Sequence, residues 1–266
     1  MRTTDSLLIP GVPQIDATPP LPVTNYSHPR CYARALQDCS TKISGEHYIS
    51  QAVIKMWAEN GVVLTNMRGS QAVDYSRMTI NNLKMNILCD RHNKALSGLD
   101  DIGKKFAEFI KNGPNQPKDI VINGSDLERW FLKIFLGLSV DFNKQQRGMD
   151  NWQPSMKLLN VLFNKYPLEK DGGFYSLLIG NTELRTHSLS INYVSDKQSK
   201  EGIGIVVSLE VVTILFSIIP SPPINPDVNA KTFFHPASLQ FPENNGNRIL
   251  HTGWSNGINI VYEKTA

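Results

Sequence analysis

The chain has 266 residues, of which 41% are hydrophobic, so a packed core is expected and wholesale disorder is excluded. Its 27 basic and 24 acidic residues leave a formal charge of only +3, so any basic surface for nucleic acid must be local. Three cysteines cannot form a complete disulfide framework. Nothing at the start resembles a signal peptide, and the longest apolar run, 203–220, is interrupted by polar residues, so no membrane contact is expected. We expect a cytoplasmic protein, in a reducing compartment where clustered cysteines more often hold metal.

The N-terminal part of the sequence predicts an arm followed by a small module. Residues 1–30 are rich in proline, threonine and serine and predict an extended arm, docked on the body or on a partner, because proline cannot join regular ladders. Residues 31–112 hold all three cysteines. A helix is expected near the end of this module, from about Leu96 to Ile110, and residues 113–117 resemble a linker.

The remainder predicts a helical connector, 118–172, and a β-rich C-terminal region, 173–266. In the connector, Ser125 and Glu128 form a capping-box pattern, so a helix is expected to begin at Ser125. Another helix is expected over about 154–163. The expected strands are 174–179, 188–194, 204–209, 211–219, 249–252 and 258–262. The fold class is therefore expected to be α+β.

Three cysteines and one histidine have spacing that suits a metal site. Seven residues separate Cys31 from Cys39, and Cys89 and His92 form a C-x-x-H pair about fifty residues later. Such a Cys3His set suits a structural Zn²⁺ with no open coordination position. The first pair is wider than the usual spacing of two to four residues. The alternative is a set of ordinary buried cysteines and a surface histidine.

An acid–histidine pair and an asparagine-rich segment accompany these ligands. Glu46 and His47 lie between the two halves of the cysteine set, and residues 86–93 read Asn-Ile-Leu-Cys-Asp-Arg-His-Asn. Over residues 31–103 this pattern resembles the HNH (ββα-metal) endonucleases with an embedded zinc site. The resemblance implies a β-hairpin that carries the acid–histidine pair, a helix packed across it, and a metal ion between them.

The resemblance also implies a role for each residue. His47 matches the general base, Glu46 and Asn93 match the ligands of a catalytic Mg²⁺ or Mn²⁺, and Asn86 takes the place of the asparagine that orients the histidine. Glu46 stands where Asp or His is commoner, and His92 replaces the more usual fourth cysteine. The chemistry is coherent, because hydrolysis of a phosphodiester needs an activated water and a Lewis acid, and a hard cation prefers oxygen ligands.

Each of these residues also has a simpler interpretation. His47 would merely precede a helix that starts at about Ile49, and Asn93 would cap a helix. Arg129 and Lys133 could meet phosphates but are interpreted as a solvated helix face, whereas Arg91 is the best candidate for a phosphate contact. The histidines of the β-rich region are expected to be structural or to lie at the surface; they are His187, His235 and His251.

Together these patterns predict a metal-dependent endonuclease that cuts nucleic acid, DNA rather than RNA, in a bacterial or phage restriction or defence setting. The β-rich region is expected to position substrate or to contact a protein partner or a second copy of the chain. The alternative is a catalytically silent, zinc-stabilised module that binds nucleic acid or protein. The geometry around His47 distinguishes the two hypotheses.

Overall fold

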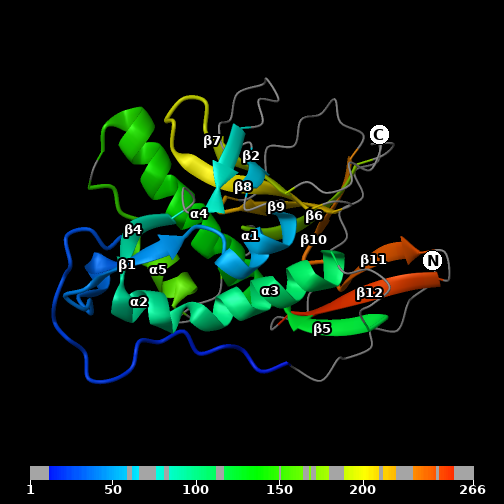
Figure 1. Cartoon of the computed structure of the whole chain (residues 1–266), viewed down its shortest axis with the longest axis horizontal. Coiled ribbons are helices and arrows are strands. Elements are labelled where there is room, and N and C mark those ends of the chain that lie inside the picture. Colours follow the sequence, from blue (N-terminus) through cyan, green and yellow to red (C-terminus); the bar gives the residue numbers. More distant parts are fainter. Residues whose placement is uncertain are drawn as a thin grey trace.

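The protein has a mixed α+β fold in the computed structural model (Figure 1). Within the part of the chain that the structure describes, no helix has both the length and the apolar character needed to cross a membrane. The structure describes residues 12–58, 62–65, 76–80, 84–111, 117–149, 151–163, 168, 172–179, 189–209, 212–219, 230–243 and 246–254.

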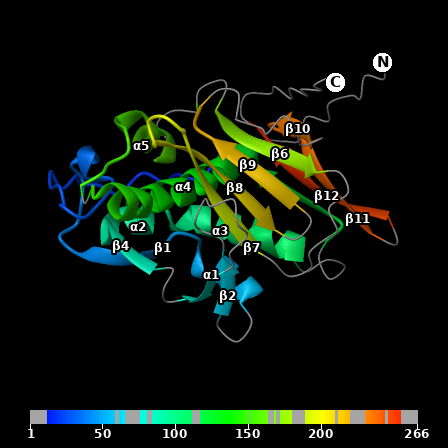
Figure 2. The same ribbon diagram turned by 90° about the horizontal axis from the view of Figure 1, so that it is seen from above.

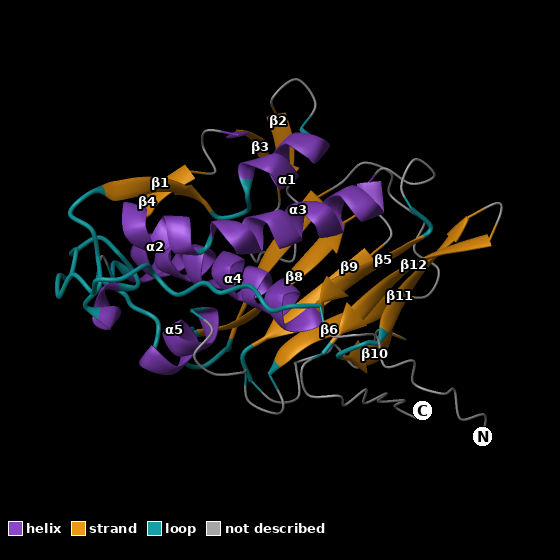
Figure 3. Cartoon of the chain, turned by 90° about the horizontal axis from the view of Figure 1, so that it is seen from below, coloured by secondary structure: helices purple, strands orange, loops and turns teal. Residues whose placement is uncertain are grey.

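A hairpin and a short helix form a ββα unit at one end of the molecule (Figure 3). Strand β1 (Ile43–His47) pairs antiparallel with β4 (Lys84–Cys89), and α2 (Asp90–Ala95) follows β4 directly and packs on both strands. The register shifts within β1 between Ser44 and Glu46. The surrounding elements are a 3₁₀ helix (Arg34–Leu36), helix α1 (Gln51–Trp57), and an antiparallel ribbon of β2 (Val62–Thr65) and β3 (Ser76–Thr79).

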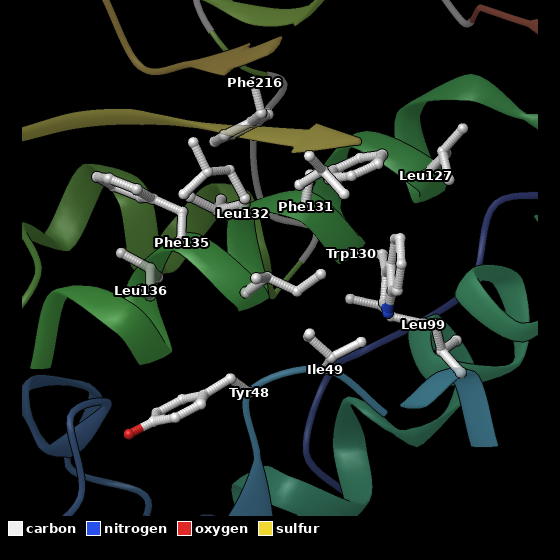
Figure 4. Close-up of a cluster of buried hydrophobic side chains, with 14 of the residues drawn as sticks. Tyr48, Ile49, Leu99, Leu127, Trp130, Phe131, Leu132, Phe135, Leu136 and Phe216 are labelled. Atoms are coloured by element: carbon white, nitrogen blue, oxygen red, sulfur yellow. The ribbon is translucent and has the colours of Figure 1, made fainter. Parts of the chain in front are cut away.

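Helix α4 (Gly124–Arg147) is the central element of the core. It packs against α3 (Ser97–Lys111) on one side and against strands of the β-rich region on the other. Trp130, Phe131 and Phe135 of α4 are buried in this core (Figure 4). The predicted helix near Leu96 to Ile110 corresponds to α3, and the helix predicted over 154–163 corresponds to α5 (Met156–Leu162).

The predicted capping box of α4 is wrong. The N-cap is Asn123, whose side chain accepts a hydrogen bond from the backbone N–H of Asp126 at 3.1 Å. Glu128 points away from the helix start, because its Oε1 accepts the backbone N–H of Phe174 at 2.7 Å. The Glu128 carboxylate therefore bonds to the β-rich region instead of the N-terminus of α4, where the local pattern had placed it.

The β-rich region forms two sheets, and α4 lies beside the larger one (Figure 2). The larger is antiparallel, with strand order β10-β6-β9-β8-β7. In the smaller, β11 (Ser238–Glu243) pairs with β12 (Gly246–Gly253), which pairs in parallel with β5 (Asp119–Asn123). The larger sheet comprises β6 (Gly173–Ile179), β7 (Leu189–Ser195), β8 (Gly202–Leu209), β9 (Val212–Ser217) and β10 (Ala230–Phe234).

Most of the predicted strands have counterparts among these, but β5, β10 and β11 were not predicted. The strand predicted at 258–262 lies outside the described residues. Strand β5 begins the segment that was expected to be a helical connector, and its only described strand partner, β12, is more than a hundred residues away in sequence. The connector is therefore built into the same fold as the C-terminal sheets.

The N-terminal arm, as far as residues 12–30 are described, is docked on the body as predicted. The backbone N–H of Ile15 donates to Asp126 Oδ2 at 2.9 Å, and Arg129 donates to the Ile15 carbonyl at 2.9 Å. Asn123 donates to the carbonyl of Val12 at 2.8 Å. Arg129 is only 3% exposed, so its assignment to a solvated helix face is wrong.

Candidate functional site

Cys31, Cys39, Cys89 and His92 come together as a buried cluster that could hold a metal ion such as zinc. Their ligand atoms all lie within 4.8 Å of one another. The Nδ1 atom of His92 lies 3.5 Å, 3.7 Å and 3.2 Å from the sulfur atoms of Cys31, Cys39 and Cys89. In a tetrahedral zinc site, neighbouring nitrogen and sulfur ligands lie about 3.5 Å apart. The spacing of the donor atoms therefore fits zinc.

Local structure explains how residues so far apart in sequence meet. Cys89 ends β4 and is the N-cap of α2, so that Cys89 and His92 lie on the first turn of one helix. The backbone N–H of Cys39 donates to the carbonyl of Tyr26 at 2.7 Å, and that of Cys31 donates to the carbonyl of His28 at 3.0 Å. These bonds hold the loop that carries the first two cysteines beside the hairpin.

The thiols interact strongly enough to shift one another's pKa values. Hydrogen bonds from Cys31 and Cys39 lower the pKa of Cys89, and contact with Cys39 and Cys89 raises the pKa of Cys31. Contact with Cys31 lowers the pKa of Cys39, but the hydrogen bond with Cys89 and burial outweigh it and raise that pKa to about 11. Cys89 is therefore the favoured thiolate, and a bound cation would have to displace the other two protons.

Glu46 and Asn93 lie together beside this cluster. The Asn93 side chain interacts with the Glu46 carboxylate, and its Nδ2 donates to Ser44 Oγ at 2.9 Å. Glu46 is only 7% exposed. Burial raises the pKa of Glu46 above its ordinary value, although Lys133 and Asn93 oppose that rise. The hairpin and α2 therefore bring two of the predicted site residues into contact.

A buried lysine also contacts this carboxylate. The Nζ atom of Lys133 lies 2.6 Å from Glu46 Oε1 and 2.6 Å from Asp100 Oδ2, and the Lys133 side chain is 2% exposed. Burial alone would lower the pKa of Lys133, but the two carboxylates outweigh it and raise that pKa. Lys133 was predicted to lie on a solvated helix face, and this prediction is wrong, because α4 is enclosed by α3 and the β-rich region.

His47 ends β1 and is half-buried. Its Nε2 atom is buried and has no hydrogen-bond partner among the described residues. Burial, followed by the nearby charge of Lys84, lowers the pKa of His47, while a backbone hydrogen bond at Ile80 opposes this shift. The imidazole is therefore favoured in its neutral form near pH 7, with a nitrogen that can take up a proton. His47 precedes a helix, as in its simpler interpretation, but α1 begins at Gln51 rather than at about Ile49.

The contacts of Asn86 and Arg91 differ from those that the sequence suggested. The residue paired with His47 across the hairpin is Lys84, whereas Asn86 is exposed on β4 and has no described hydrogen bond to His47. Arg91 forms two contacts with Asp38, Nε to Oδ1 at 2.9 Å and a terminal nitrogen to Oδ2 at 3.0 Å. The same terminal nitrogen donates to the Pro22 carbonyl at 3.0 Å. Arg91 therefore fastens the arm to α2, and its guanidinium is already engaged.

Asp100 and Lys133 were missed as neighbours of the site. Asp100 lies on α3 and Lys133 on α4, outside the pattern that pointed to Glu46 and Asn93. Helical spacing placed Lys133 on the polar face of its helix. Only the packing of α3 against α4 shows that this face contacts other elements of the protein rather than water.

Comparisons with known proteins gave no match among family models, curated proteins or solved structures. The residues of the site are therefore the basis for inferring the function of this protein.

Proposed function

We propose that this protein is a metal-dependent endonuclease of the HNH type, which hydrolyses phosphodiester bonds of nucleic acid, with DNA as the first substrate to test. The observation that carries the proposal is the grouping of Glu46, His47 and Asn93 on one hairpin and the helix that follows it, beside a Cys3His cluster. Glu46 and Asn93 are in contact and carry oxygen ligands for a cation, and His47, a neutral base, is the next residue along β1.

In this proposal the Cys3His cluster is a structural zinc site. All four ligands are no more than 1% exposed, which leaves no open side for a substrate or water. The cluster joins the 31–39 loop to the start of α2, the helix that carries Asn93. Zinc would thus fix Asn93 relative to the hairpin, a task that suits a closed tetrahedral site.

The residues around Glu46 fit a second, harder cation. Glu46 and Asp100 carry two negative charges and Lys133 one positive charge, so the group retains one net negative charge when ionised. Lys133 contacts Oε1 of Glu46, and Asn93, which contacts the same carboxylate, carries an amide oxygen of the type that Mg²⁺ and Mn²⁺ prefer. When bound, such an ion would stabilise the charge that develops on the phosphate and on the leaving oxygen.

His47 would act as the general base. Its buried Nε2 lacks a hydrogen-bond partner among the described residues, and its lowered pKa favours the neutral form at pH 7. A neutral imidazole can take the proton of an attacking water, and a positioned general base contributes a factor of about 10² to 10⁴ to a rate. Loss of this side chain should therefore abolish cleavage without disturbing the zinc cluster.

The experiment compares the parent protein with His47→Ala, using His251→Ala as the control. His251 is a partly exposed histidine on β12, in the smaller sheet. Supercoiled plasmid is incubated with Mg²⁺ or Mn²⁺, and zinc content and melting temperature are measured on the same preparations. We expect His47→Ala to lose at least about 100-fold in rate, with zinc content unchanged. Equal cleavage by His47→Ala and the parent would refute the assignment of His47 as the base.

One observation favours a second candidate, a catalytically silent zinc module that binds nucleic acid or protein. The ion pair between Lys133 and a nearly buried Glu46 already neutralises part of the charge that would attract a divalent ion. In that case the parent would retard labelled DNA in a gel but would leave plasmid intact with either ion. Cleavage that depends on His47 would exclude this candidate.

A further inference from the structure

Lys133 connects three elements of the fold at the edge of the proposed active site. It lies on α4, Glu46 lies on β1 and Asp100 lies on α3. Its Nζ makes two contacts of 2.6 Å, one to each carboxylate, and its side chain is 2% exposed. A buried ammonium is tolerated only where carboxylates and hydrogen bonds replace its lost hydration, so this position is held by both partners.

The contact restricts a side chain that would otherwise have considerable freedom. A glutamate has three side-chain torsions, and its carboxylate can turn among several positions. Lys133 holds one oxygen of Glu46, while Asn93 contacts the same carboxylate from α2. The direction of the second oxygen is therefore set from two sides.

We propose that Lys133 is a positioning residue of the active site, which holds Glu46 in the orientation that a divalent cation requires. The inference rests on the proposed nuclease function. Lys133 itself does not contact the substrate in this scheme and acts through Glu46. It gives the hairpin a required partner outside residues 31–112.

The same contact assigns a role to the β-rich region. Two residues before Lys133, the Phe131 ring packs 5.6 Å from that of Phe174. Two residues after it, the Phe135 ring lies 5.8 Å from that of Tyr193 and 6.3 Å from that of Phe216. The larger sheet thus holds α4 in place on both sides of Lys133, and so supports the orientation of Glu46.

The test measures Mn²⁺ binding as well as cleavage, on the full-length zinc-loaded protein. Mn²⁺ affinity is determined by electron paramagnetic resonance for the parent, Lys133→Met and Lys133→Gln. Lys104→Met, which removes an exposed lysine of α3, is the control. Groups that orient metal ligands typically contribute about 10- to 100-fold to metal affinity or activity. We expect losses of that size in Mn²⁺ affinity and kcat for both Lys133 variants, with KM for plasmid little changed.

The outcomes separate this inference from the proposed function. A parent protein that neither binds Mn²⁺ nor cleaves plasmid would refute the proposed function, and the inference with it. An active parent with equally active Lys133 variants would overturn the inference alone. Higher Mn²⁺ affinity in Lys133→Met would also overturn it, since the ammonium would then compete with the ion. If Lys133→Met fails to fold, Lys133→Gln decides, because its amide keeps a polar group beside the two carboxylates but is neutral and too short to reproduce both ammonium contacts.

Discussion

Removal of the metal from the Cys3His cluster should destabilise the protein strongly. The four ligands are fully buried, and the residues around them, among them Tyr32, Ala33 and Leu88, belong to the main hydrophobic core. Apparent binding of a structural zinc ion contributes about 10 kcal/mol or more. The total stability of a domain is about 5–15 kcal/mol. Loss of the ion should therefore unfold at least the arm and the ββα unit.

His92→Ala is the sharpest form of this perturbation. It removes one ligand and leaves three buried thiols. His28→Ala removes a half-buried histidine outside the cluster, whose ring accepts a backbone N–H from Arg30 and packs edge-on against Tyr26. Near this chain length, 1 kcal/mol shifts the melting temperature by about 2–4 °C. A loss of about 5 kcal/mol, half of the zinc contribution, therefore predicts a decrease of more than about 10 °C.

The assay combines zinc content by atomic spectroscopy with a melting curve by circular dichroism, both before and after chelation. The parent and His28→Ala should carry one zinc per chain and lose stability on chelation. His92→Ala should carry less zinc and melt between the parent and the chelated parent. A parent protein that purifies without zinc after growth in zinc-supplemented medium, and melts at the same temperature as His92→Ala, would refute the reasoning.

Three further predictions concern charge and packing. Because the pKa of His47 is lowered from its ordinary value of 6.5, cleavage should persist near neutral pH and decline as pH falls through the lowered pKa. Lys84→Met removes a nearby positive charge, so a pH–rate profile of this variant should show the decline at higher pH. A profile identical to that of the parent would contradict the role given to Lys84. Arg91→Ala removes the guanidinium that contacts Asp38 and the Pro22 carbonyl, so it should lower the free energy of unfolding by about 2 kcal/mol and speed proteolysis of the arm. Arg30→Ala, at an exposed arginine, is the control. Equal rates of proteolysis for both variants would contradict a role of Arg91 in fastening the arm. Gly103→Ala would place a methyl group 2.1 Å from the Trp130 ring and should cost about 1–3 kcal/mol in denaturant titration, whereas Gly253→Ala has open space and should cost less.

The Cys3His cluster could be predicted from the sequence because half of the set is local. Cys89 and His92 are three residues apart and share the first turn of α2, so their spacing alone predicts that both side chains can bind the same ion. Cys31 and Cys39, the wider pair, are held near them by backbone hydrogen bonds within their loop, which the sequence does not predict. Their gathering in one cluster is confirmed, although the catalytic roles of Glu46, His47 and Asn93 remain predictions.

The charged residues of α4 could not be predicted, for a physical reason. Helical spacing distinguishes an apolar face from a polar face and assigns the polar face to water. Helix α4 is enclosed on both sides, so both side chains meet carboxylates instead of water. Arg129 pairs with the buried Asp126 one turn away on the same helix, and Lys133 contacts the buried Glu46 and the partly buried Asp100. The two contacts of Lys133 join elements distant in sequence, and no local pattern encodes them.

The contacts of Arg91, beside the candidate site, could not be predicted from the sequence either. Its place in sequence between Cys89 and His92 made it the best candidate for a phosphate contact beside the expected metal site. In the structure Asp38, from the loop between the first two cysteines, meets its guanidinium with both carboxylate oxygens. A basic residue next to a motif is therefore a phosphate contact only if the fold leaves it without a carboxylate partner.

The most direct test of the account is a Mn²⁺ titration of plasmid cleavage by the zinc-loaded protein, carried out in parallel for the parent and His47→Ala. Nicked and linear products from the parent should rise with Mn²⁺ concentration and disappear on its removal, while the variant should yield neither. Intact plasmid at every Mn²⁺ concentration, with zinc still bound to the parent, would contradict the account.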